Sequence, residues 1–286
     1  MNKVGFVGLG RLGEPASRCL HQAGFSLLLY DRDCLIVEKL SKEYGAVAAR
    51  DLSEFSSCEV ILTALPDGKA VREAALQMNL SDRTVLVDMS SSAPSDTQSL
   101  AKELKAGIVD APVSGGVKAA RTGDLVFMVG GDVDDVARAR PLLDAMGASV
   151  THMGPTGAGH ALKAINNYIA AAGYIACCEG LIAGRRFGLD PRAMLDVIDQ
   201  SSGASYNTKG KFRQHVLPRT WGSGFGLGLM AKDVRIALEL GRQTGTPFRL
   251  GDRVSALWDE AAEALEASAD HTEFIRLLEQ ATGTRL

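Results

Sequence analysis

Three glycines near the start of the chain have the spacing of a dinucleotide-binding turn. Residues 8–13 read GLGRLG, after an apolar run that predicts a strand and before a segment with helical spacing. In such a turn the first glycine permits a tight bend, the second lets backbone approach a pyrophosphate, and the third lets helix pack on strand. The helix N-terminus adds free N–H groups and a positive dipole end. We therefore expect a cofactor-binding turn made of Gly8, Leu9, Gly10, Arg11, Leu12 and Gly13.

Asp31 and Arg32 follow the second predicted strand and bear on the choice between NAD and NADP. Asp31 stands close to the expected distance of about 20 residues from the glycines, where an acidic side chain binds the ribose hydroxyls. Its charge would also repel a 2′-phosphate. Arg32 could stack on adenine, meet a 2′-phosphate, or extend into solvent as an ordinary surface residue. Because Asp31 is the better placed, the sequence favours NAD and leaves NADP possible.

Lys163 and Asn167 lie four residues apart in a segment that predicts a helix, so both project from one face. Alanine, leucine and isoleucine flank the lysine. A partly desolvated lysine can take the proton of an alcohol as hydride leaves, and the amide of Asn167 can hold the same oxygen. A solvated surface lysine is the alternative. His160, one turn earlier, is a second candidate base, for which we expect a structural or rim role.

A serine and two glycines form the second candidate binding site. Ser114, Gly115 and Gly116 end an apolar run. A hydroxyl beside glycine-exposed backbone N–H groups makes a small anion nest suited to a carboxylate. A plain turn between strands is the alternative.

Composition excludes several classes of partner. The chain has 286 residues, 46% hydrophobic and 23% charged, and a formal net charge of −3. This charge gives no basic field for nucleic acid or for an anionic membrane surface. Glycines interrupt the apolar start of the chain, so we expect a first strand there and no signal peptide. The sequence has no apolar run of about 18 residues, so we expect no membrane-spanning helix. The five cysteines lack metal-ligand spacing, so we expect no metal site and a reducing, cytoplasmic location.

The elements that must position these residues alternate between strand and helix in the first half. Strand-like runs occur at 3–8, 25–30, 60–65, 84–87, 108–110, 125–129 and 149–153, with helical spacing at 12–23, 69–80, 94–105 and 133–145. This alternation predicts an α/β fold with an N-terminal Rossmann-type, doubly wound parallel sheet.

The second half is expected to be all-helical. Helices are predicted at 159–188, after Pro191, and at 230–244, 253–267 and 271–282. We therefore expect a dinucleotide-binding domain at 1–157 and a helical substrate and dimerisation domain at 158–286. The long helix after residue 159 is rich in alanine and isoleucine, which predicts at least a dimer.

Five motifs occur in a fixed order along the chain. They are GLGRLG at 8–13, DMSS at 88–91, DAPVSGG at 110–116, GxGxxxKxxNN at 157–167 and KD at 232–233. Together they resemble the β-hydroxyacid dehydrogenases, the group that contains 3-hydroxyisobutyrate dehydrogenase and tartronate semialdehyde reductase. The resemblance covers essentially the whole chain. It departs at Leu12, where the family usually has methionine.

The resemblance implies an oxidoreductase that transfers hydride between a nicotinamide cofactor and a small 3-hydroxy acid or its semialdehyde. In the family the residues matching Lys163 and Asn167 are catalytic and substrate-orienting, and the segment matching Ser114, Gly115 and Gly116 binds the substrate carboxylate. The resemblance also implies cofactor contacts from Leu65, Pro66, Ser91 and Lys232. Family members commonly assemble through their helical domains, so we expect a homodimer or homotetramer.

Two alternative functions are disfavoured by the sequence. Imine reductases share this architecture but generally lack the lysine, so Lys163 favours an alcohol substrate. A non-catalytic nucleotide-binding protein would be expected to lose that lysine or add basic modules.

Phe225 could cover the substrate or anchor the helical core. The particular substrate, such as 3-hydroxyisobutyrate, glycerate or tartronate semialdehyde, is left undecided.

Overall fold

The chain folds into two compact units, Met1–Lys163 and Ala164–Leu286. The structure is a computed structural model that describes residues 3–286. The division falls inside the long helix α7 (Ala158–Phe187), whereas the sequence analysis divides the chain before this helix. Helix α7 therefore begins in the first unit and continues in the second.

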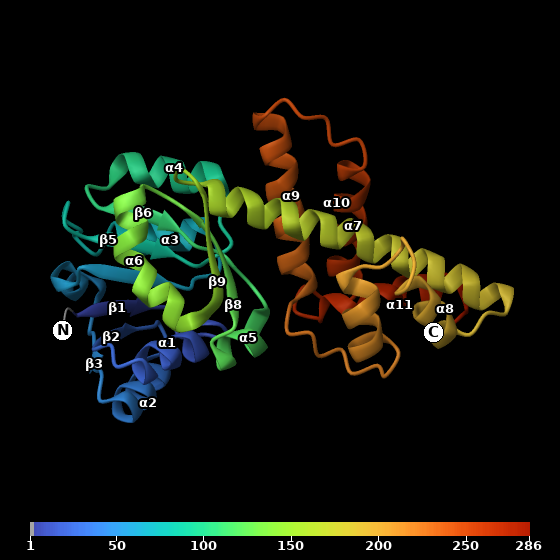
Figure 1. Ribbon diagram of the computed structural model, residues 1–286, viewed down its shortest axis with the longest axis horizontal. Helices are drawn as coiled ribbons and strands as arrows, with labels where there is room; N and C mark the ends of the chain where they lie inside the picture. Colours follow the sequence, from blue (N-terminus) through green and yellow to red (C-terminus); the bar gives the residue numbers. More distant parts are fainter. Residues whose placement is uncertain (1–2) are drawn as a thin grey trace. The chain divides into compact units, whose positions relative to one another are not determined.

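The first unit is built on a sheet, drawn in Figure 1, that has nine strands among the described residues. Its strands are β1 (Val4–Val7), β2 (Leu27–Tyr30), β3 (Val47–Ala48), β4 (Val60–Thr63), β5 (Val85–Asp88), β6 (Gly107–Asp110), β7 (Val113–Ser114), β8 (Leu125–Gly130) and β9 (Gly147–Gly154). The first six run parallel in the order 3-2-1-4-5-6. This is the strand order of dinucleotide-binding folds, and the predicted Rossmann-type α/β class is confirmed.

The far side of the sheet departs from the predicted all-parallel arrangement. Strand β8 pairs antiparallel with β6 and β7, and β9 then pairs parallel with β8. An antiparallel pair needs only a short connection, and helix α5 (Gly116–Thr122) with its flanking turns supplies the one between β7 and β8. Helix α6 (Val133–Met146) makes the longer crossover to β9.

Apolar side chains on both faces of the sheet explain why the strands read as continuous apolar runs. Helices α1 (Gly13–Gln22), α2 (Cys34–Tyr44) and α6 pack on one face. Helices α3 (Gly68–Ala75) and α4 (Pro94–Glu103) and the 3₁₀ helix η1 (Leu52–Ser57) pack on the other. Helix α2 was not predicted from the sequence, although its capping signals are present. The Asp33 side chain accepts from the Leu35 N–H, and Gly45 ends the helix at φ 62°.

The second unit is helical, as predicted. After α7 come α8 (Pro191–Ile198), the π-helix η2 (Asn207–Val216), α9 (Leu227–Gln243), α10 (Gly251–Ala264), the 3₁₀ helix η3 (His271–Phe274) and α11 (Ile275–Thr282). Its core is centred on the buried ring of Tyr174, with Phe212 stacked on it and Trp258 close by. The π-helix lies where no element was predicted. All five cysteines are free. Within residues 3–286 no helix combines the length and the apolar character needed to cross a membrane.

Candidate active site

The glycine turn between β1 and α1 has the backbone shape that its spacing predicts. Gly8 has φ 93°, and a Cβ there would lie 2.4 Å from the Ala64 carbonyl oxygen. A Cβ on Gly13 would lie 1.8 Å from the Gly8 carbonyl oxygen. At Gly10 a Cβ would meet no atom of residues 3–286 within 4 Å. Within the same residues, helix α1 has no side-chain cap at its N-terminus. The turn therefore offers uncapped N–H groups and open space, which fits a pyrophosphate.

Asp31 and Arg32 lie in different surroundings. The Asp31 carboxylate accepts from the Leu9 N–H at 2.6 Å and from the Asp33 N–H at 2.9 Å. The Arg32 side chain is 86% exposed and lies 3.7 Å from a Glu73 carboxylate oxygen. The fold thus holds the acidic side chain against the glycine turn and leaves the arginine in solvent.

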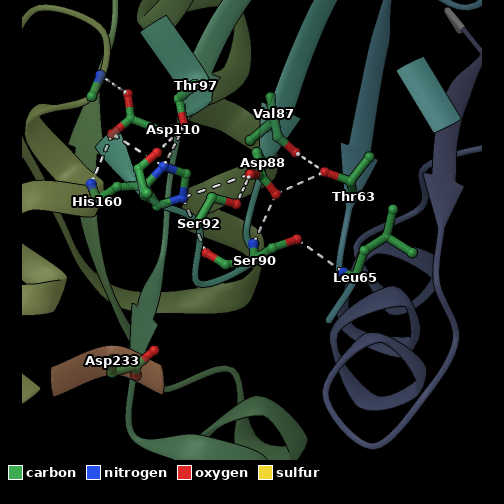
Figure 2. Close-up of polar contacts among 12 residues, drawn as sticks. Thr63, Leu65, Val87, Asp88, Ser90, Ser92, Thr97, Asp110, His160 and Asp233 are labelled. Atoms are coloured by element: carbon green, nitrogen blue, oxygen red, sulfur yellow. Dashed lines mark hydrogen bonds and ion pairs between the residues drawn. The ribbon is translucent and has the colours of Figure 1, made fainter. Parts of the chain in front are cut away.

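The segments that follow β4 and β5 meet at the same edge of the sheet. The Leu65 N–H donates to Ser90 Oγ at 2.9 Å, and the Ser90 N–H donates to Asp88 Oδ1 at 2.9 Å (Figure 2). Ser91 is half-buried and Pro66 is exposed. Carboxyl ends of adjacent parallel strands form the usual ligand edge of such a sheet. Leu65 and Ser91 therefore belong to neighbouring segments at that edge.

The segment Ser114, Gly115 and Gly116 joins β7 to α5. Gly115 has φ 111° and Gly116 has φ 63°. Glycine adopts such positive φ values readily because it has no Cβ. Both glycines are exposed. The backbone is therefore open to a ligand at this turn.

A buried carboxylate holds the first turn of α7. Asp110 Oδ1 accepts from the Gly157 N–H at 2.7 Å, and Oδ2 accepts from the His160 N–H at 2.9 Å (Figure 2). The first N–H groups of a helix lack an intrahelical carbonyl partner, so Asp110 caps α7 from the end of β6. Asp110 belongs to the DAPVSGG motif, but no role was predicted for it from the sequence. Its position at the carboxyl end of a buried strand was the available signal.

His160 is buried in the first unit, with 1% of its surface exposed. Its Nε2 donates to the Ser90 carbonyl oxygen at 3.1 Å, because a carbonyl can only accept. Its Nδ1 lies 2.8 Å from the Thr97 hydroxyl. Burial favours a structural role for His160 over a rim position. Lys163 follows three residues later and is half-buried.

Asn167 and Lys232 share a partner in the second unit. Asn167 Nδ2 donates to Asp233 Oδ2 at 2.5 Å. The Lys232 ammonium lies 3.4 Å from Asp233 Oδ1, and this oxygen has no hydrogen bond among residues 3–286. Asp233 is 2% exposed. A buried carboxylate thus orients the Asn167 amide and pairs with Lys232, a function that the sequence analysis did not predict for Asp233.

Phe225 is one of the residues for which the sequence left two roles open. Its ring meets the His271 ring edge-on, with centroids 5.8 Å apart, and packs against the second unit's core. This packing supports the anchor role. Across the described part of the chain, no group of three histidine, cysteine or acidic residues is placed to hold a metal ion.

Comparison with protein families covers nearly the whole chain. A family model described as the NAD binding domain of 6-phosphogluconate dehydrogenase matches residues 3–154. A second, described as NAD-binding of NADP-dependent 3-hydroxyisobutyrate dehydrogenase, matches residues 157–278.

Similar curated proteins are dehydrogenases of small hydroxy acids. The 2-(hydroxymethyl)glutarate dehydrogenase of Eubacterium barkeri is 30% identical, covering 98% of this chain and 96% of the relative. The mitochondrial 3-hydroxyisobutyrate dehydrogenase of Mus musculus is 35% identical, covering 87% and 78%. The NAD-dependent L-serine dehydrogenase of Pseudomonas aeruginosa is 31% identical, covering 90% and 91%.

Solved structures agree with these sequences. The 3-hydroxyisobutyrate dehydrogenase of Mycobacterium tuberculosis with L-serine superposes with a TM-score of 0.89 at 30% identity, covering 97% of this chain and 99% of the other. A complex of Psf3 with NADP⁺ and 2-OPP superposes with a TM-score of 0.82 at 25% identity, covering 96% of this chain and 99% of the other. Fold, glycine turn and relatives together define an NAD(P)-dependent hydroxyacid dehydrogenase. Within that class, the chain belongs to the β-hydroxyacid dehydrogenase family.

Proposed function

We propose that this enzyme interconverts a small 3-hydroxy acid and its semialdehyde, with Lys163 as the general acid–base. One observation carries the proposal. Lys163 and Asn167 lie one turn apart on α7, the helix whose first turn is fixed by buried hydrogen bonds to the ligand edge of the sheet. Side chains four residues apart share a helix face, so an amine and an amide are available to the same substrate oxygen.

NAD is the preferred cofactor in this proposal, with NADP the second choice. The binding residues are Gly8, Leu9, Gly10, Arg11, Leu12, Gly13, Asp31, Arg32, Leu65, Pro66, Ser91 and Lys232. The preference rests on Asp31, which is fixed at the turn, while Arg32 is mostly exposed. When bound, the nicotinamide supplies the hydride acceptor for oxidation and the donor for reduction.

The chain's own residues supply binding and proton transfer. In oxidation Lys163 Nζ, in its neutral form, takes the hydroxyl proton, and in reduction the ammonium returns it. Asn167, fixed by Asp233, holds the substrate oxygen that is a hydroxyl in the alcohol and a carbonyl in the semialdehyde. Ser114 Oγ and the N–H groups of Gly115 and Gly116 hold the carboxylate. These contacts orient the alcohol carbon and add no competing base.

The named relatives narrow the substrate class. 3-Hydroxyisobutyrate, 2-(hydroxymethyl)glutarate and serine are the compounds in their names. All three carry a carboxylate and a hydroxymethyl group on the same carbon, and they differ in the remaining substituent. A 2-substituted 3-hydroxypropanoate is therefore the substrate class that we propose for this chain.

The proposal also includes assembly and location. A homodimer or homotetramer is supported by apolar side chains left exposed on α7, where Ile169 is 64% and Phe187 85% exposed. The net charge of −3 supports neither nucleic acid nor membrane as a partner. Free cysteines throughout support the reducing cytoplasm.

A substrate panel tests the proposal. Purified protein is assayed with three- and four-carbon hydroxy acids by the absorbance of reduced nicotinamide, with NAD and NADP in parallel. We expect turnover of 2-substituted 3-hydroxypropanoates, fastest with NAD. The matching 2-hydroxy acids, which lack the hydroxyl on carbon 3, serve as controls and should be inert. Equal turnover of both series would contradict the proposed substrate class.

A further inference from the structure

We propose that Asp110 and His160 are positioning residues that hold Lys163 for proton transfer, an inference that rests on the acid–base role proposed for Lys163. All three belong to the first unit. His160 lies three residues before Lys163 on α7, so one helical turn separates them. His160 is too buried to reach a substrate, and any effect it has on the reaction must act through the helix.

Asp110 fixes the start of this helix. Its two carboxylate oxygens accept separate N–H groups, from Gly157 and from His160. The side chain is fully buried, and the two N–H groups restrain both of its oxygens. A carboxylate at the end of β6 therefore fixes where α7 begins relative to the sheet.

His160 ties the same turn to the segments at the ligand edge. Its Nε2 donates to the Ser90 carbonyl, and the Ser90 hydroxyl in turn accepts the Leu65 N–H (Figure 2). Leu65 is among the residues that we propose contact the cofactor. Two hydrogen bonds, one to the backbone and one to the side chain of Ser90, thus link a cofactor-side segment to the helical turn that precedes Lys163.

Tight packing prevents the turn from sliding. A Cβ on Gly159 would lie 2.2 Å from the Met128 carbonyl oxygen and 2.9 Å from Asp110 Oδ2. The backbone of α7 at Gly159 therefore lies directly against the backbone of β6 and β8. Close-packed interiors transmit such constraints because they have few alternative arrangements. The position of Lys163 is set by contacts made three residues earlier.

Misplacement of a reacting group by about 1 Å can cost about 100-fold in rate. His160→Ala should therefore lower kcat by about 30- to 100-fold, while substrate KM and the Kd of NADH change by less than about 3-fold. His160→Gln, whose amide can still donate to the Ser90 carbonyl, should recover part of the loss. His21→Ala is the control. His21 lies at the C-terminal end of α1, stacked on Tyr44, and its replacement should leave kcat unchanged.

A double-mutant cycle with Lys163→Ala separates positioning from general damage. We expect His160→Ala to cost less than about 3-fold further when Lys163 is already absent. Hydrogen exchange gives a readout that does not depend on turnover: amides of residues 157–163 should exchange at least about 10-fold faster in His160→Ala. If that variant does not fold, Thr97→Val removes one partner of the ring and should shift kcat and exchange in the same direction.

The outcomes are distinguishable. An equal loss in both backgrounds, or unchanged kcat with unchanged exchange, would overturn the positioning role and leave the role of Lys163 intact. Near-normal turnover in Lys163→Ala alone would overturn the proposed base, and the positioning inference with it.

Discussion

The Asp31 carboxylate accepts a hydrogen bond from the Leu9 backbone N–H at 2.6 Å, which joins the end of β2 to the glycine turn after β1. The contact spans 22 residues of sequence. It places a negative charge beside the turn proposed to bind the cofactor phosphates and ribose. Cofactor choice should therefore depend on this side chain.

Asp31→Ser should shift preference toward NADP, because the substitution removes repulsion of the 2′-phosphate and leaves Arg32 nearby. We expect the ratio of kcat/KM for NAD over NADP to fall by at least about 10-fold, equivalent to about 1.4 kcal/mol. Asp33→Ser, which removes a neighbouring carboxylate that caps α2, is the control. A wild-type enzyme that already prefers NADP would show that Arg32 dominates.

Gly10→Val should weaken cofactor binding and leave the fold intact. A Cβ at Gly10 would meet no atom of the described residues within 4 Å, so the valine would fill space proposed for the pyrophosphate. We expect the Kd of NADH to rise at least about 10-fold in a fluorescence titration, with little change in thermal unfolding. Gly180→Val, at another open glycine on α7, is the matched control. Unchanged cofactor affinity in Gly10→Val would contradict the assignment of the turn.

Short sequence patterns predicted the features of this protein that depend only on neighbouring residues. The glycine spacing, the apolar strand runs and the spacing of Lys163 and Asn167 each depend on a few neighbouring residues. The cap of α7 could not be found in this way, because Asp110 and Gly157 are 47 residues apart. The antiparallel pairing of β8 was likewise missed, since the pairing partner of a strand is chosen by the whole sheet.

Acid should destabilise the second unit through His271. Burial, reinforced by the charge of Lys211, lowers the pKa of His271 to about 4, while Asp270 opposes the shift. Between this value and the unfolded value of about 6.5, the unfolded chain binds more protons. Stability is therefore complete above about pH 6.5 and falls as pH drops toward 4, by up to about 3 kcal/mol.

Urea unfolding at a series of pH values from 7 to 4 measures how the free energy of unfolding depends on pH, and this dependence is the slope to compare. His271→Gln should flatten it, even if the variant is less stable at pH 7. His152→Gln, an exposed histidine of the first unit, should keep the wild-type slope. An unchanged slope in His271→Gln would show that other groups account for the acid sensitivity.

Light scattering at micromolar concentration should give a mass of at least two chains. Exposed Ile169 and Phe187 on α7 are the reason, because large apolar side chains on one helix favour association. Ile169→Lys should raise the dissociation constant of the assembly, whereas Leu35→Lys, at an exposed residue of α2, should not. A wild-type monomer would contradict the proposed assembly.

The pH dependence of Lys163→Ala tests the central claim most directly. In the wild-type enzyme, alcohol oxidation should accelerate as pH rises and Lys163 loses its proton. Lys163→Ala should lower kcat by about 10²- to 10⁴-fold and lose this limb of the profile, with the Kd of NADH changed little. Lys163→Arg should not restore the rate, because a guanidinium keeps its proton. Lys105→Ala, an exposed lysine of the first unit, is the control. Near-normal turnover with the pH limb retained in Lys163→Ala would contradict the account.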